Sequence, residues 1–201
     1  GGVNSINPVD INAFVRPGAE IKEGLLPVNM AFANIGLTDN LSMEAFYQLE
    51  FQETVVPGCG TYFSTSDTLA PGCNSVSVGG GVTNLSRNED GVRKASDDGQ
   101  FGVAFRYISE ALGDTEFGFY AMNIHSRAPA AEGIIQNSDS NVIVRASEAS
   151  YYIVYPEDQT ITGLSFATNI GSVALSGEIS HSQDVPVQIN GIHFISSLLG
   201  L

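Results

Sequence analysis

The sequence predicts an all-β fold, built as an antiparallel up-and-down meander of strands. In several segments apolar and polar residues alternate with a period of two, which is the side-chain period of a strand and not of a helix. Glycine supplies 22 of the 201 residues, above the usual ~7%, and this favours turns and strands. Hydrophobic residues make up 43% of the chain, too many for a disordered acidic tail, so we expect it to fold.

The most regular segment runs from Leu41 to Glu53. All six odd-numbered positions from 41 to 51 are apolar, and every even-numbered position except Phe46 is polar. A strand with this pattern has one apolar and one polar face. A looser alternation covers Val28 to Leu37, and residues 38–40 are Thr-Asp-Asn, which suit a turn. The two segments are therefore predicted to form a hairpin.

A second hairpin is predicted from Phe101 to Ser109 and from Glu116 to Arg127, with a turn at residues 112–114. In the first arm the odd-numbered positions from 101 to 107 are apolar. In the second arm Phe117 and its odd-numbered neighbours favour one face, whereas Tyr120 and its even-numbered neighbours favour the other. We therefore expect a bulge that switches the register midway along this arm.

A third hairpin is predicted from Thr160 to Asn169 and from Val173 to Ser182. The turns inside the hairpins are short, whereas the connections between hairpins, at about 56–99 and 128–159, each exceed thirty residues. Short turns that alternate with long external loops are typical of outer-membrane β-barrels, whose strands have about 9 to 11 residues. Residues 1–201 are thus predicted to form a single partial domain of a transmembrane β-barrel in the bacterial outer membrane.

Six strands are fewer than the ~8 of the smallest transmembrane barrels. A sheet edge that is open to lipid leaves backbone groups without hydrogen bonds, which costs several kcal/mol for each group. The chain also begins with Gly-Gly-Val and ends on an apolar run from Ile195 to Leu201. We therefore expect an internal fragment of a longer polypeptide, folded as an open curved sheet with two exposed edges.

The period of two assigns side chains to the two faces of this wall. The candidates for the lumen are Glu44, Gln48, Glu50, Arg106, Glu110 and Glu178. The candidates for the lipid face are Leu41, Met43, Tyr47, Leu49, Phe51, Phe101, Phe105 and Leu175. Glu44 or Glu50 near Arg106 would form a charged ladder that either lines a polar path or seals it, and stability of a packed lumen is an equally open role.

Cys59 and Cys73 flank a stretch rich in Thr, Ser, Gly and Pro that has loop character. In an exported protein this spacing favours a disulfide that closes a surface loop. A structural zinc site needs four Cys or His ligands, and no third or fourth lies nearby in the sequence.

The charge balance argues against nucleic acid as a partner. The chain has 8 Lys and Arg against 22 Asp and Glu, for a net charge of −14, and its cations are scattered. No run approaches the ~18 apolar residues of a transmembrane helix.

No enzyme motif is present, so we assign no catalytic residue, no cofactor and no metal. His125 and His181 are expected at strand ends near the outer rim of the barrel. Calcium is a weaker alternative, because the acidic and amide runs at 88–90, 97–98 and 137–141 supply oxygen ligands. None of these runs has the spacing of a calcium-binding loop, and a solvated acidic surface is the simpler interpretation.

Several sequence runs carry a family resemblance, namely Gly1 to Asp10, Pro17 to Glu23, Gly36 to Ser42, Phe46 to Glu50, Asp114 to Gly118, Tyr155 to Asp158 and Gly163 to Phe166. They resemble a large proteobacterial family of unknown function, the domain of unknown function 1302 type, regarded as outer-membrane β-barrels. The resemblance runs from end to end, and its longer members imply that this chain is an internal portion. The chain departs from the family mainly in long loops such as Gly79 to Lys94.

The resemblance implies a location and a transport role more than a chemistry. Its expected partners are outer-membrane lipid, a hydrophobic small-molecule ligand, and periplasmic lipid-handling proteins that work with inner-membrane exporters. The first functional hypothesis is therefore a channel or transporter for hydrophobic or amphipathic small molecules. A secreted soluble β-sandwich that serves as a binding module is the alternative. A hydrolase embedded in a barrel is a third possibility, although no motif brings a serine and a histidine together.

Overall fold

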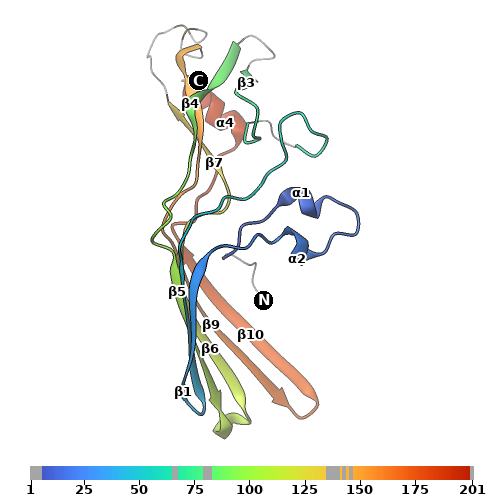
Figure 1. Ribbon diagram of the computed structural model, residues 1–201, viewed down its shortest axis with the longest axis vertical. Helices are drawn as coiled ribbons and strands as arrows, with labels where there is room; N and C mark the ends of the chain where they lie inside the picture. Colours follow the sequence, from blue (N-terminus) through green and yellow to red (C-terminus); the bar gives the residue numbers. More distant parts are fainter. Residues whose placement is uncertain are drawn as a thin grey trace.

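The computed structural model describes residues 6–64, 68–78, 83–134, 141, 144 and 147–199. Its main feature is a six-stranded antiparallel sheet with the order β1-β2-β5-β6-β9-β10. The strands are β1 (Met30–Thr38), β2 (Leu41–Gln48), β5 (Phe101–Ser109), β6 (Thr115–Ile124), β9 (Gln159–Ile170) and β10 (Val173–Gln183). The all-β, antiparallel prediction is confirmed, and the sheet is curved and open (Figure 1).

All three predicted hairpins are present. The β9–β10 turn uses Gly171 at φ +63°, and the β5–β6 connection passes through a short 3₁₀ helix, η1 (Glu110–Leu112), to Gly113 at φ +70°. Glycine suits both positions because it adopts positive φ without a steric penalty from Cβ. The predicted bulge in the second hairpin is wrong, because β6 keeps an unbroken register with both of its neighbours from Glu116 to Asn123.

The strand β2 ends at Gln48, five residues before the predicted end at Glu53. Beyond Gln48 the backbone bonds to other groups: the Glu50 carboxylate accepts the backbone N–H of Asn29 at 3.1 Å. The backbone N–H of Phe51 donates to Asp97 Oδ1 at 2.9 Å. Backbone N–H groups therefore donate to side-chain carboxylates where the backbone hydrogen bonds of the sheet end. The alternation of apolar and polar residues continues beyond this point.

The segments at 56–99 and 128–159, which we expected to be long loops, contain a second sheet. Its strands are β3 (Ser75–Val78), β4 (Thr83–Arg93), β7 (Ala130–Ile134) and β8 (Ser150–Val154), in the order β3-β4-β8-β7. The β4–β8 pair is parallel, so the prediction of purely antiparallel pairing holds for the larger sheet alone. The two sheets lie end to end along the long axis of the molecule (Figure 1).

The hydrophobic core lies in and beside this second sheet. Its buried residues are Phe51, Leu85, Ala95, Ala149, Tyr151, Ile153 and Tyr155. Phe51 meets the Tyr155 ring edge-on, with ring centroids 5.3 Å apart. The prediction that Phe51 faces lipid is therefore wrong: it lies beyond the end of β2, and its ring packs inward at the junction of the two sheets.

The N-terminal segment packs beside this junction. It contains two one-turn helices, α1 (Ile11–Phe14) and α2 (Ile21–Gly24), which lie to one side of the sheets (Figure 1). Isolated bridges join Val9 to Leu25 and Asp10 to Val55. At the other end, α4 (Gly191–Leu199) lies near β7. Of the described helices, none is both long enough and apolar enough to cross a membrane.

The predicted disulfide is confirmed. Cys59 and Cys73 are bonded with their Cα atoms 5.4 Å apart, and the backbone N–H of Cys59 donates to the Pro71 carbonyl at 2.9 Å. The bond closes the loop that precedes β3.

Candidate functional site

One face of the six-stranded sheet is a continuous apolar surface. The register aligns Met43 on β2 with Phe105 on β5, Phe119 on β6, Leu164 on β9 and Ile179 on β10. The row next to it toward the hairpin turns includes Tyr107, Phe117 and Phe166. Cross-strand neighbours lie on the same face of a sheet, so these rows form one surface.

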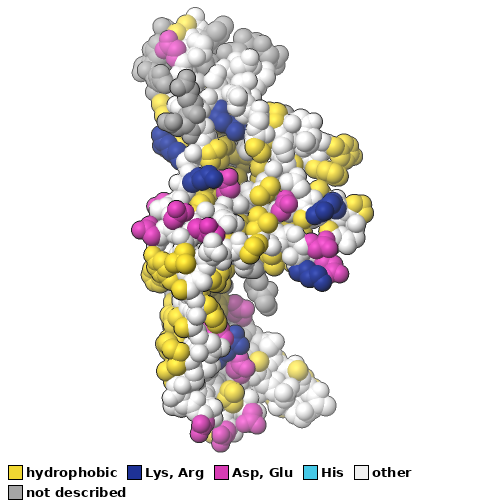
Figure 2. Space-filling view, in the orientation of Figure 1, with side chains coloured by type: hydrophobic (Ala, Val, Ile, Leu, Met, Phe, Trp, Pro, Cys, Tyr) yellow, Lys and Arg dark blue, Asp and Glu magenta, His cyan; other side chains and the backbone are white. Residues whose placement is uncertain are grey.

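The described residues leave much of this apolar surface bare. Leu164 is 55% exposed and Ile179 is 71% exposed. The other members with large exposed areas are Ile35, Tyr47, Phe101, Tyr107, Phe117, Phe119, Phe166, Ile170, Val173 and Leu175. Hydrophobic side chains cover the outer side of the strands, whereas charged side chains are visible within the hollow of the sheet (Figure 2). Monomeric soluble proteins rarely expose an apolar surface of this extent.

The predicted lipid-facing residues mostly lie on this surface. Leu41, Met43 and Tyr47 share it on β2, Phe101 and Phe105 share it on β5, and Leu175 lies on it in β10. Leu49 is exposed but follows the end of β2, and Phe51 belongs to the core as described above.

The opposite face of the sheet carries charged and polar groups together with some apolar side chains, among them Phe32, which is exposed. Arg106 on β5 forms an ion pair with Glu44 on β2, with Nη2 3.5 Å from Oε2. The Asn34 amide on β1 donates to Glu44 Oε1 at 3.4 Å. This arrangement is the charged ladder that alternation predicts, and it spans three adjacent strands.

A second polar contact crosses the other side of this face. The hydroxyl of Tyr120 on β6 donates to Glu178 on β10. It does so across Gly163 on β9, where a Cβ would collide with the Tyr120 ring. Gly102 similarly leaves room for the ring of Phe46, the one apolar residue in the even positions of β2. Glycines on this face therefore accommodate the aromatic rings of neighbouring strands.

Only some of the residues predicted to face the lumen lie exposed on this face. Glu44, Arg106 and Glu178 lie on it together. Gln48 has the same parity on β2 as Glu44 but is completely buried, and its amide donates to the Ile6 carbonyl at 3.0 Å. Glu50 lies beyond β2 and bonds to the loop at Asn29. Glu110 lies in η1 and accepts from the Asn40 amide at 3.2 Å, at the turn end of the sheet.

Gln48 belongs to a buried polar network around Arg127, at the end of the sheet that meets the second sheet. Arg127 Nη2 donates to the side-chain oxygens of Gln48 and Gln100, the latter at 3.0 Å, and to the Ile6 carbonyl at 3.2 Å. Arg127 Nη1 donates to the Gln52 carbonyl at 2.9 Å. All these acceptors are neutral. Burial lowers the pKa of Arg127 well below its usual value, to about 10.

The sequence did not single out this network, but it contains a signal for it. Gln48 ends β2, Gln100 precedes β5, His125 follows β6 and Gln159 begins β9. In an antiparallel meander these four positions lie at the same end of the sheet. Hydrogen-bonding side chains therefore recur at one level of the sheet, where the N-terminal segment covers it.

His125 is buried, with 1% of its surface exposed. Its Nδ1 accepts the backbone N–H of Asp158 at 3.1 Å, and its Nε2 lies 2.8 Å from the Asp98 carbonyl oxygen. A carbonyl oxygen only accepts, so Nε2 carries the proton in the neutral ring. Ser96 Oγ lies 3.5 Å from this same Nε2 but donates to Glu157 Oε1 at 3.1 Å.

This cluster does not have the arrangement of a hydrolase triad. A catalytic histidine must accept the serine proton on the nitrogen that faces the serine, and in His125 that nitrogen is already a donor. His125 directly follows the last residue of β6, as expected for a strand end, and it is enclosed at the junction of the sheets. His181 lies exposed on β10.

Among the described residues, no group of three or more His, Cys, Asp or Glu side chains could hold a metal ion. Residues 88–90 belong to β4, and Asp97 accepts the backbone N–H of Phe51. Residues 137–140 of the third acidic run lie outside the described residues.

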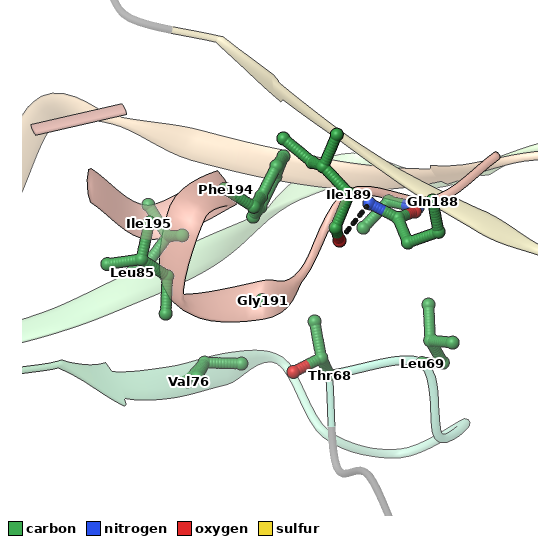
Figure 3. Close-up of a pocket in the computed structure, with 10 residues that line it drawn as sticks. Thr68, Leu69, Val76, Leu85, Gln188, Ile189, Gly191, Phe194 and Ile195 are labelled. Atoms are coloured by element: carbon green, nitrogen blue, oxygen red, sulfur yellow. Dashed lines mark hydrogen bonds between the residues drawn. The ribbon is translucent and has the colours of Figure 1, made fainter. Parts of the chain in front are cut away.

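A small cavity of about 190 Å³ lies between the second sheet and α4. Val76 and Leu85 line it from the sheet, and Phe194 and Ile195 line it from the helix (Figure 3). The Gln188 side chain lies at its rim, where Oε1 accepts the backbone N–H of Ala131 at 2.7 Å. The lining is therefore mainly apolar and continuous with the core.

Comparison with known proteins gives one match. The family described as "Protein of unknown function (DUF1302)" matches residues 1–200. No curated protein matches the chain, and no solved structure matches it. The matched region includes both sheets and the junction between them.

Proposed function

The chain belongs to the DUF1302 family of proteins of unknown function, and we propose that its six-stranded sheet is part of the wall of a transmembrane β-barrel in the bacterial outer membrane. In this proposal the barrel is a channel or transporter that moves hydrophobic or amphipathic small molecules across that membrane. Its immediate partners are membrane lipid and the transported molecule.

The observation that carries the proposal is that one face of the sheet is apolar and exposed whereas the other carries charged side chains. The bare apolar face, with Leu164 at 55% exposed, would meet lipid. The face with the Glu44–Arg106 ion pair would line the lumen. Strands of a transmembrane barrel have the same dyad pattern, with apolar residues outward and polar residues inward. The six strands have 8 to 12 residues, which agrees with the length needed to cross a bilayer obliquely.

The two unpaired edges of the sheet are an argument that further strands complete the native barrel. Within the described residues, β1 and β10 each pair with another strand on one side only. In lipid an open edge leaves unpaired N–H and C=O groups, each at a cost of several kcal/mol. We propose that additional strands of a longer polypeptide close the barrel, and that periplasmic lipid-handling proteins and an inner-membrane exporter exchange its cargo.

Single-cysteine labelling tests the assignment of the faces. Both cysteines of residues 1–201 are in the disulfide, so an introduced thiol is the sole free one within this part of the polypeptide. We expect Ser165→Cys to react with a water-soluble maleimide in intact outer membranes. Leu164→Cys and Phe166→Cys should react only with a lipid-soluble maleimide, because they lie on the opposite face.

Two outcomes would overturn the proposal. Full-length protein that remains monodisperse without detergent would exclude a membrane barrel. If Leu164→Cys and Phe166→Cys react with neither reagent, the apolar face is covered by protein, as the β-sandwich alternative requires. In the described residues that face is not covered by the second sheet, which lies end to end with the first.

A further inference from the structure

A groove of about 490 Å³ opens on the polar face of the sheet, at the end nearest the N-terminal segment. Ile124 of β6 and Ile161 of β9 form its wall on the sheet, and Val9 and Val185 line it from the flanking segments. Arg127 and Gln159 also line it. A site that takes a small molecule typically has this size and this mainly apolar lining.

The apolar wall of the groove continues along the polar face. The register aligns Ile161 with Met122 on β6, which aligns with Gly102 on β5 and then with Phe46 on β2. A band of apolar side chains therefore crosses the proposed lumen at this level. The Glu44–Arg106 ladder lies on the same face, nearer the hairpin turns. A molecule in the groove would thus contact apolar surface on the sheet side.

The polar part of the groove is cationic, and the described residues supply no ion-pair partner for it. Among the described residues no carboxylate forms an ion pair with Arg127, whose acceptors are amide and carbonyl oxygens. Arg127 Nε and Gln159 Nε2 are buried donors without a hydrogen-bond partner in the described part of the chain. A partly buried guanidinium without an anion is costly, so an acceptor with negative charge is favoured there.

These observations select one class of ligand. A carboxylate presents two charged acceptors whose spacing matches a guanidinium, and it would replace neutral acceptors with charged ones. An apolar tail would pack against Ile124 and Ile161. We propose that this groove binds monocarboxylates with an apolar tail, with the carboxylate at Arg127 and the tail along the apolar band. The inference rests on the proposed transport function and names its substrate class.

Calorimetric titration tests the groove directly. The full native polypeptide, in a non-ionic detergent and with a detergent blank, would be titrated with decanoate, 1-decanol and acetate. We expect decanoate to bind roughly tenfold or more tightly than decanol, because only decanoate supplies a charge-assisted partner for Arg127. Acetate, which has the charge without the tail, should give no measurable binding.

Two variants and one matched control locate the binding. Arg127→Gln should reduce the affinity for decanoate by roughly tenfold or more and leave that for decanol unchanged. Arg16→Gln removes the same charge from an exposed position that does not line the groove and should leave both affinities unchanged. Val185→Trp fills the groove from a rim position that is 52% exposed, so it should abolish binding of both decyl ligands without disturbing the fold.

Equal affinities for decanoate and decanol would overturn the inference, as would full decanoate binding by Val185→Trp. The second result decides the matter even if Arg127→Gln does not fold. Neither result bears on the labelling of Ser165→Cys and Leu164→Cys in membranes, so the barrel proposal can stand when this one fails. Conversely, selective decanoate binding by a protein that needs no detergent would keep the groove and remove the barrel.

Discussion

The hydroxyl of Tyr120 on β6 donates a hydrogen bond to Glu178 on β10, across the full width of the intervening strand β9. The contact is possible because Gly163 leaves the space that the Tyr120 ring occupies. The contact depends on the register of three strands. The contact therefore connects β10, an edge strand, to the interior of the sheet.

Removal of this hydroxyl should weaken the attachment of β10. We expect Tyr120→Phe to lower the free energy of unfolding by about 1 kcal/mol, because the bond is charge-assisted but partly exposed to solvent. Tyr107→Phe is the control, because that hydroxyl lies on the opposite face and has no hydrogen-bond partner among the described residues. Guanidinium titration of protein refolded into lipid vesicles measures both. Equal losses for the two variants would contradict the structural role of the Tyr120–Glu178 bond.

The opposition of the two faces predicts contrasting effects of the same substitution at adjacent positions. Leu164→Arg introduces a cation on the apolar face near the middle of β9, and should destabilise the lipid-inserted state by about 2–4 kcal/mol. Ser165→Arg introduces it on the polar face in the same row as Glu178, and should cost much less. The fraction folded in vesicles as a function of guanidinium gives both values. A larger loss for Ser165→Arg would mean that the faces are reversed.

The alternation of side chains was sufficient to predict the larger sheet. In β2 and β5 the apolar face is encoded locally, because a period of two requires no knowledge of the partner strand. The three hairpins could be predicted because only a short turn separates the two strands of each. The prediction was wrong within β6, since Tyr120 and Met122 are apolar or aromatic yet lie on the polar face. These side chains fit on the polar face because neighbouring strands have glycines such as Gly163 beside them. The sequence of β6 alone does not show which residues of other strands lie next to it.

The second sheet and the Arg127 network were missed because they depend on distant contacts. The strand β4 is rich in polar residues and resembles a loop, and it pairs in parallel with β8, which is a short apolar run without alternation. Arg127 and Gln48 are 79 residues apart in the chain. Pairing of this kind is set by tertiary packing, so a single sequence predicts the hairpins far better than the site at their end.

The disulfide should stabilise the loop that precedes β3. Cys59 and Cys73 are 14 residues apart, and closure of a loop of this length contributes about 3 kcal/mol in the chain-entropy description. We expect reduction to increase amide hydrogen exchange in residues 68–78, while exchange in β5 and β6 remains unchanged. A Cys59→Ser, Cys73→Ser double variant should behave like the reduced protein. Unchanged exchange after reduction would contradict a stabilising role.

Burial of Tyr155 predicts a sensitivity to alkaline pH. Burial, with a smaller effect from Glu53, raises the pKa of the Tyr155 hydroxyl above its usual value of 10. The folded state therefore holds this proton to higher pH than the unfolded chain, so the stability contributed by Tyr155 is present below about pH 10 and is lost as pH rises beyond it. We expect Tyr155→Phe to move the midpoint of alkaline unfolding to higher pH.

Arg127 titrates in the same pH range, but its effect on the pH dependence of stability is opposite to that of Tyr155. The native chain and Tyr155→Phe must therefore be compared directly. The pKa of Arg127 is lowered to about 10 in the folded state, so from about pH 10 upward the unfolded chain binds more protons and this group alone makes stability rise with pH. That contribution is common to the native chain and to Tyr155→Phe, and it cancels in their difference. Tyr62→Phe, at a position 94% exposed, should leave the midpoint unchanged. Circular dichroism from pH 8 to about pH 12 measures the midpoints of alkaline unfolding. Equal midpoints for Tyr155→Phe and the native chain would show that the buried hydroxyl does not govern alkaline unfolding.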